Sequence, residues 1–256
     1  MLALLGDSHT RSYKVSDVVA TRIFLAPGRR NNFKNNLNLF TTTLRYLRAA
    51  SKLKSGGLDL AFIIGEPDIR WLAYGRMDIG KNEAVFESEK QLSVDEKALN
   101  KLVLRFKLFL VITQFFKYQP SVIIGSGTPN PEIVLASSFL NEKLSNVCKD
   151  FGCLFFDPQK FSVLNQERVS EKFIGYSVFN STQKDWTHLS TAISSPFEEF
   201  VRRNHYQQKS VNFGCKKNAN FEKYFVEIQN FNTYTPKELW PKKLVKFIGR
   251  RIKLLR

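Results

Sequence analysis

MLALLGDSH, residues 1–9, is a short apolar run that ends in Gly6-Asp7-Ser8. Continuous apolar runs of this length are typical of strands buried on both faces, and a glycine beside Asp and Ser is typical of a turn. We therefore expect a buried strand over residues 1–6 that enters a turn at Ser8. The serine hydroxyl would then lie at the end of that strand, and the next residue, His9, is interpreted as a wall of the same site.

Four more apolar runs follow, and helical patterns separate them. The runs are residues 18–26 (VVATRIFLA), 58–64 (LDLAFII), 120–125 (PSVIIG) and 153–157 (CLFFD). Apolar residues at helical spacing cover residues 37–54, 93–118 and 130–151, and a last helix is expected after His188 to about residue 203. Alternation of helices with fully apolar strands predicts an α/β fold, with a parallel sheet covered by helices on both faces.

Polar motifs stand where the first and third predicted strands end. Ser8 follows the first strand and Glu66 follows the third. The carboxyl ends of parallel strands meet at one edge of the sheet, where active groups collect. If a helix begins just after Ser8, its free backbone N–H groups could stabilise an oxyanion there. The alternative is that Asp7-Ser8 forms an ordinary turn or helix cap.

Asp185-Trp186-Thr187-His188 is the second candidate motif. A spacing of three places both end side chains on one side of a turn, where the aspartate can orient the imidazole and the imidazole can take a serine proton. The chain holds only three histidines, which makes His188 more informative. The alternative is an exposed loop in which this spacing arises by chance.

Together these motifs resemble the SGNH/GDSL hydrolase superfamily over about residues 1–203. The resemblance implies a three-layer α/β/α sandwich with a flavodoxin-like parallel sheet of about five strands. It also implies Ser8 as nucleophile, His188 as base and Asp185 as its partner. The family's second oxyanion donor is a backbone glycine after the second strand, and Gly28 is the candidate here. We expect no cofactor and no metal.

The third motif, residues 65–70 (GEPDIR), departs from the family's usual Gly-x-Asn-Asp and resembles a bacterial subgroup with Gly-Glu-x-Asp-x-Arg. Pro67 takes the place of the asparagine and offers no donor, so an inactive member is an alternative. Arg70 could donate to an oxyanion or bind an acidic substrate group, or it could form a salt bridge that only shapes the loop. The candidates for oxyanion or substrate binding are Gly65, Glu66, Asp68 and Arg70.

Positive charge is concentrated near the C-terminus. The net charge is +16, and residues 205–256 contain 12 Lys and Arg but only 3 Asp and Glu. We therefore predict an α/β domain over residues 1–204 and a basic extension over residues 205–256. Residues 242–256 have apolar and basic side chains on opposite halves of a helical wheel, with Arg251 as the exception. This pattern is typical of a helix on an anionic membrane, and residues 238–256 are the segment expected to bind it. The alternative is a helix packed on the protein's own core. Nucleic-acid binding is not expected, because no recognition motif accompanies the charge.

Compartment is predicted from what the sequence contains. Three cysteines without metal-ligand spacing favour a reducing compartment,. We read no signal peptide and no apolar run of about 18 residues. The expected location is the cytoplasm, including the inner face of the plasma membrane.

Two classes of function follow. The first is a serine esterase or acyltransferase that acts through an acyl-enzyme on Ser8, with O-acetyl groups of a glycan or glycolipid among the expected substrates. The second is a non-catalytic glycan- or partner-binding module on the same fold, or a scaffold, docked to a membrane by its basic tail. Pro67 favours the second class, and the intact Ser8, Asp185 and His188 favour the first.

Overall fold

A five-stranded parallel sheet forms the centre of the fold. The computed structural model describes residues 2–6, 8–13, 19–24, 36–74, 96–165, 168–176 and 182–208. The strand order is β2-β1-β3-β4-β5, and every neighbouring pair is parallel. This order is the flavodoxin-like one, so the predicted fold class is confirmed. The strands are β1 Leu2–Gly6, β2 Val19–Phe24, β3 Asp59–Ile63, β4 Val122–Ile124 and β5 Leu154–Phe156.

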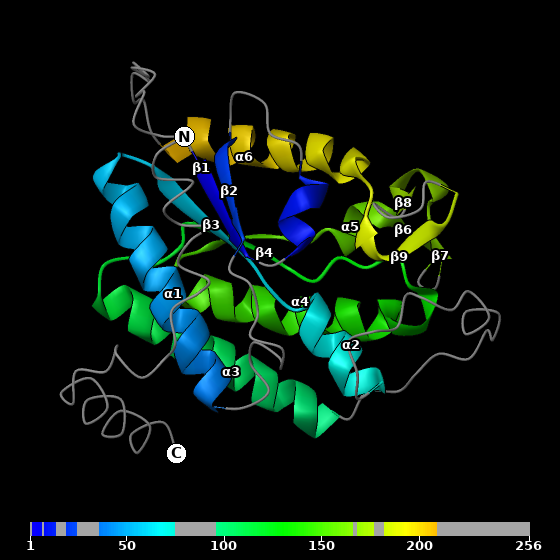
Figure 1. Ribbon diagram of the computed structural model, residues 1–256, viewed down its shortest axis with the longest axis horizontal. Coiled ribbons are helices and arrows are strands. Elements are labelled where there is room, and N and C mark those ends of the chain that lie inside the picture. Colours follow the sequence, from blue (N-terminus) through cyan, green and yellow to red (C-terminus); the bar gives the residue numbers. More distant parts are fainter. Residues whose placement is uncertain are drawn as a thin grey trace. The chain divides into compact units, whose positions relative to one another are not determined.

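Helices cover both faces of the sheet (Figure 1). One face carries three long helices, of which the middle one packs against the other two: α1 Asn36–Ser55, α3 Glu96–Phe115 and α4 Val134–Asp150. The other face carries α6, Ser194–Gln208, and the 3-10 helix η1, Ser8–Ser12. The three layers are therefore those expected from the alternation of strands and helices. Shorter helices lie in the connections: α2 Glu66–Tyr74, α5 Gln159–Ser162, η3 Pro131–Ile133, η4 Glu171–Phe173 and η5 Thr191–Ile193.

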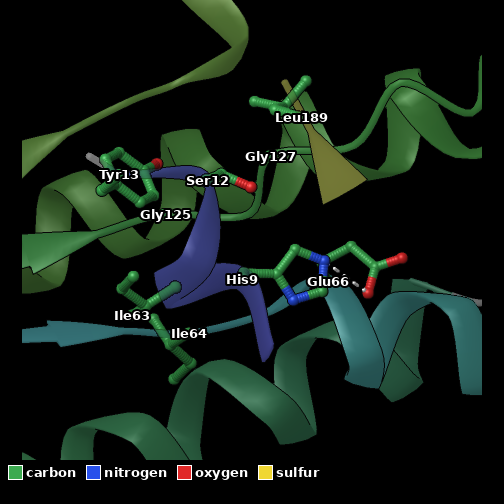
Figure 2. A pocket seen from close by; sticks show the side chains of 9 residues that line it. All are labelled: His9, Ser12, Tyr13, Ile63, Ile64, Glu66, Gly125, Gly127 and Leu189. Carbon is green, nitrogen blue, oxygen red and sulfur yellow. Dashed lines mark ion pairs between the residues drawn. The ribbon is translucent and has the colours of Figure 1, made fainter. Parts of the chain in front are cut away.

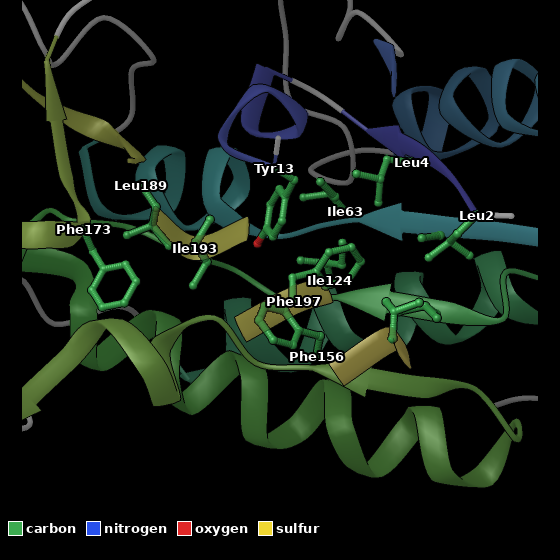
Figure 3. Packing of buried hydrophobic residues seen from close by; sticks show 13 residues of the cluster. Leu2, Leu4, Tyr13, Ile63, Ile124, Phe156, Phe173, Leu189, Ile193 and Phe197 are labelled. Atoms are coloured by element: carbon green, nitrogen blue, oxygen red, sulfur yellow. The ribbon is translucent and has the colours of Figure 1, made fainter. Parts of the chain in front are cut away.

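Alternate residues of the strands pack into two separate cores. On the α1 side, Phe62 of β3 contacts Tyr46 and Phe109, with ring centroids 5.4 and 4.7 Å away. On the α6 side, Ile63 joins an apolar cluster that includes Phe197 and other buried residues of β1, β4 and α6 (Figure 3). Because both faces of each strand are covered, the strands read as continuous apolar runs rather than alternating ones.

Two segments differ from the sequence-based expectation. The stretch from residue 161 to residue 184 lies outside the predicted strands and helices, yet two short antiparallel pairs are found between residues 163 and 189: β6 Val163–Asn165 with β7 Arg168–Val169, and β8 Ile174–Tyr176 with β9 Lys184–Leu189. The motif GEPDIR, predicted as a loop, begins helix α2, since the N–H of Ile69 donates to the carbonyl of Gly65 at 3.0 Å. Acidic residues and a proline in a first helical turn are both favourable, which explains the helix.

Several predicted features lie outside the described residues. They are Gly28, the start of the helix predicted over residues 93–118, and residues 209–256 of the basic segment. Helix α6 continues past residue 204 to Gln208, and the residues after it are not described. The division between residues 1–204 and 205–256 therefore stays a prediction. Within the described part of the chain, no helix is both long and apolar enough to span a bilayer.

Candidate active site

Ser8 is the first residue of η1 and follows the carboxyl end of β1 after a single residue. β1 is an inner strand, with β2 on one side and β3 on the other. The backbone of Ser8 therefore lies at the middle of the sheet edge where a parallel α/β fold places its active groups. This is the position that the sequence predicted for it.

Asp185 and His188 form a close pair in β9. The Asp185 carboxylate lies 3.1 Å from Nδ1 of His188 through Oδ2, and its Oδ1 accepts backbone N–H bonds from Thr187 at 2.9 Å and His188 at 3.1 Å. The pairing with β8 moves from Asp185 directly to Leu189, so the residues between them bulge out of the ladder. The predicted turn thus exists as an interruption of a strand, and the aspartate side chain closes it.

The ionisation of Asp185 suits an orienting role. Burial raises the pKa of this carboxyl, but hydrogen bonds and the charge of His188, together with two backbone N–H groups, lower it to about 2. An ionised carboxylate only accepts hydrogen bonds, so Nδ1 of His188 carries the proton of the neutral ring. Nε2 then holds the lone pair, which is the arrangement that a general base requires.

His9 joins the first motif to this pair. Its ring lies 4.5 Å from the ring of His188, centroid to centroid, and the planes are tilted by 36°. Its Nε2 lies 3.0 Å from the backbone oxygen of Thr187 and 3.1 Å from Oε2 of Glu66 (Figure 2). Since His9 directly follows Ser8 in the chain, this contact brings the predicted nucleophile's motif beside the predicted base.

The third motif contributes Glu66 and Arg70 to the same cluster. Nη2 of Arg70 lies 3.0 Å from Oε2 of Glu66, and Nη1 donates to the hydroxyl of Thr187 at 3.3 Å. Burial raises the pKa of the Glu66 carboxyl, but the charges of Arg70 and His9 outweigh it and hold the pKa below its usual value. Of the roles predicted for Arg70, the contact with Glu66 is that of the salt bridge. The contact with Thr187 also joins Arg70 to the segment Asp185-Trp186-Thr187-His188, called the DxxH segment below.

The other residues of the third motif are buried where β3 passes into α2. Gly65 has φ +115°, and a Cβ there would lie 3.1 Å from a methyl of Leu140 and 3.2 Å from the Cβ of Ser126. Pro67 is buried in the first turn of α2, where a missing N–H costs no helical hydrogen bond,. The carboxylate of Asp68 is buried and interacts electrostatically with Arg105 of α3.

Replacing Gly65 by alanine is expected to lower the free energy of unfolding by about 1–3 kcal/mol, because a Cβ is strained at this φ and crowded by its neighbours. Urea unfolding followed by circular dichroism measures the difference. Gly175→Ala is the matched control, since the nearest atom to its new Cβ would be 3.5 Å away. Equal stabilities for the two variants would contradict the strain at Gly65.

A small cavity of 10 Å³ lies beside His9 and Glu66. Its wall also includes Gly125 and Gly127, which follow the carboxyl end of β4 (Figure 2). A space of this size takes about one water molecule and no ester group.

Two contributors were not assigned these contacts from the sequence. Thr187 was only a spacer in DxxH, and His9 was read as a site wall, yet both connect the three motifs. The proximity of His9 to Ser8 and the scarcity of histidine were the available signals. For Thr187 the sequence offers no signal, because its partners come from α2 and η1.

No protein-family profile matches the sequence, and no curated protein matches it. Among solved structures, a protein assigned as an acylhydrolase from Bacteroides fragilis is similar, with 10% identity over 80% of this chain and 86% of that one, at TM-score 0.48. A GDSL-like lipase from Bacteroides thetaiotaomicron has 9% identity over 81% and 87%, at TM-score 0.43. Phospholipase A1 from Streptomyces albidoflavus has 13% identity over 79% and 98%, at TM-score 0.37.

The assignment of the fold comes from the chain itself. Its five parallel strands follow the order expected from the resemblance. The first and third motifs stand at the carboxyl ends of β1 and β3, and the DxxH motif comes just before the last described helix. The described part of the chain therefore has a flavodoxin-like three-layer fold, with the motifs in the order that the resemblance implies.

Proposed function

We propose that this protein is an SGNH-type serine ester hydrolase that uses Ser8, His188 and Asp185. The observation that carries the proposal is the Asp185–His188 pair, whose 3.1 Å contact and backbone hydrogen bonds fix an imidazole in the tautomer of a base. The contact between the rings of His188 and His9, the residue that follows Ser8, supports the same grouping.

The reaction proceeds in two halves. The Ser8 hydroxyl attacks the ester carbonyl while Nε2 of His188 takes its proton, and the same proton then goes to the departing alcohol. Water, deprotonated by His188, next attacks the acyl-enzyme and releases the acid together with Ser8. Asp185 stabilises the imidazolium in both halves. The backbone N–H of Ser8 and, as proposed from the sequence, that of Gly28 would donate to the oxyanion, because Pro67 has no donor to offer.

The narrower parts of the proposal rest on the sequence. The substrates we propose are O-acetyl groups of a glycan or glycolipid, and a hydroxyl could replace water as acceptor and make the enzyme an acyltransferase. The excess of Lys and Arg in residues 205–256 supports an anionic membrane surface as a partner through residues 238–256,. A cytoplasmic location, including the inner face of the plasma membrane, belongs to the same proposal.

A fluorophosphonate probe tests the nucleophile directly, because it reacts with serines that a neighbouring base activates. We expect the wild type to be labelled at Ser8 and the Ser8→Ala variant to lose the label. Ser55→Ala, a serine at the end of α1 that bonds only locally to Lys52, is the matched control and should label like the wild type. Equal labelling of the Ser8→Ala protein would remove Ser8 as nucleophile.

A non-catalytic binding module on the same fold is the second candidate, and Pro67 is the observation that favours it. In that case the folded wild type is not labelled and hydrolyses no acetyl ester. Binding of an acetylated glycan, measured by titration calorimetry, would then be undiminished in Ser8→Ala. The two candidates thus give opposite results with the same pair of proteins.

A further inference from the structure

Two carboxylate–imidazole pairs lie against each other in this site. Asp185 contacts His188, Glu66 contacts His9, and the centroids of the two tilted imidazole rings lie 4.5 Å apart. The first pair belongs to the proposed reaction. The second pair has no role in it and is deeply buried, with 4% of His9 and 2% of Glu66 exposed.

The protonation of His9 at Nε2 follows from its neighbours. Nε2 contacts two acceptors among the described residues, the Thr187 backbone oxygen and Oε2 of Glu66. Nε2 must therefore carry a proton and donate it. The same Oε2 also accepts from Arg70 at 3.0 Å, so a single carboxylate oxygen holds one group from η1 and one from α2.

The two side chains that contact Oε2 of Glu66, His9 and Arg70, also contact Thr187. His9 donates to its backbone oxygen, and Arg70 donates to its hydroxyl. Thr187 stands between Asp185 and His188 and donates its own N–H to Asp185. β9 pairs with β8 in a two-stranded unit outside the central sheet, so hydrogen bonds in the central sheet do not hold the DxxH segment against the motif of Ser8.

We propose that Glu66 is a positioning residue which, through His9 and Arg70, holds Thr187 and thereby sets the place of His188 relative to Ser8. This inference rests on the proposed function and deepens it. Glu66 touches no reacting atom in this assignment. Its removal should lower turnover and leave the affinity for a small neutral ester largely unchanged.

Charge gives the proposal a second readout. Among the residues that the structure describes, the charged and titratable groups in the cluster of His188 include Asp185 on its own strand, His9 on η1, and Glu66 and Arg70 on α2. The Glu66 carboxylate interacts with the charge of His188, and a nearby negative charge favours the imidazolium form of a histidine. Loss of that negative charge should lower the pKa of His188, and the acid limb of kcat/KM, which follows the free base, should move to lower pH.

The test compares Glu66→Gln with Asp59→Asn, the same carboxyl-to-amide change at the opposite end of β3. We expect Glu66→Gln to lower kcat about 10- to 100-fold, the scale known for partners that orient a metal-binding histidine, with KM for p-nitrophenyl acetate nearly constant. NMR titration of the three histidines should show a lower pKa for His188 in Glu66→Gln and the wild-type value in Asp59→Asn. Wild-type kcat in Glu66→Gln, or an unmoved His188 titration, would overturn the proposal.

Thr187→Val is the second variant, and it keeps the test decisive if Glu66→Gln fails to fold. The substitution preserves the shape of the side chain and the charge of Glu66, but it removes the Thr187 hydroxyl that accepts the hydrogen bond from Nη1 of Arg70. We expect a lower kcat with the acid limb at its wild-type pH, and a wild-type kcat in this variant would count against the positioning role. If wild type itself hydrolyses no ester, the proposed function fails, whereas the NMR titration still reports whether Glu66 acts on His188.

Discussion

Replacing His188 by alanine is expected to lower the turnover of a soluble acetyl ester by about 10³-fold or more, as loss of a triad base does elsewhere. Ser8→Ala should lower turnover at least as much, because the serine oxygen forms the covalent bond to the acyl group, whereas the imidazole only takes the proton of that serine. The double variant should lose no more activity than Ser8→Ala alone, since the two residues act in one step.

Stopped assays of p-nitrophenyl acetate hydrolysis measure these losses, with thermal unfolding recorded for each protein. Losses that simply add in the double variant would contradict a shared step. Wild-type turnover in His188→Ala would remove this residue as the base.

Asp185→Asn is expected to lower turnover by about 10³- to 10⁴-fold, the range for an aspartate that fixes an imidazole tautomer. The reason lies in the backbone contacts. Oδ1 accepts the N–H groups of Thr187 and His188, so the amide oxygen of Asn should keep that place. The amide NH₂ would then face Nδ1 of His188, which favours the tautomer whose Nε2 carries the proton and cannot act as a base.

Turnover and stability together separate this effect from unfolding. The pKa of Asp185 in the folded protein is about 2, below its ordinary unfolded value of about 3.9,. Its ionisation therefore stabilises the fold above about pH 4, and this stabilisation is lost as pH falls towards about 2. The difference in stability between wild type and Asp185→Asn should shrink over that interval. A full loss of turnover with no preference for the Nε2-protonated tautomer in nitrogen NMR would contradict the explanation.

The layers of the fold could be predicted from the sequence, because strands buried on both faces consist of consecutive apolar residues. Strand β3 reads as a continuous apolar run since Leu60 and Phe62 face one core while Ala61 and Ile63 face the other. Such a pattern depends only on neighbours in the chain and the spacing of side chains. The order of strands needed the resemblance as well, because pairing joins segments that lie far apart.

The contacts of the site could be predicted only in part. Asp185 and His188 are three residues apart, so their pairing is local and their spacing announces it. The contacts of Thr187 with His9 and Arg70 span 178 and 117 residues and leave no periodic pattern. For α2, the acidic first turn and Pro67 were helix signals that the reading as a loop overlooked. Residues 161–184 are polar and their strands very short, so hydrophobic periodicity could not identify them.

At the interruption of β9, the site combines contacts between residues that are close in the sequence with contacts between residues that are far apart in it. Asp185 closes its own turn and holds its own imidazole with bonds that reach no further than three residues. That unit should form wherever the segment is ordered, whereas its alignment with Ser8 requires the rest of the domain. Damage at a distance would thus yield a protein whose histidine still titrates as a paired base but whose serine no longer reacts. We therefore expect that the paired titration of His188 can be retained in a variant whose Ser8 has lost its reactivity.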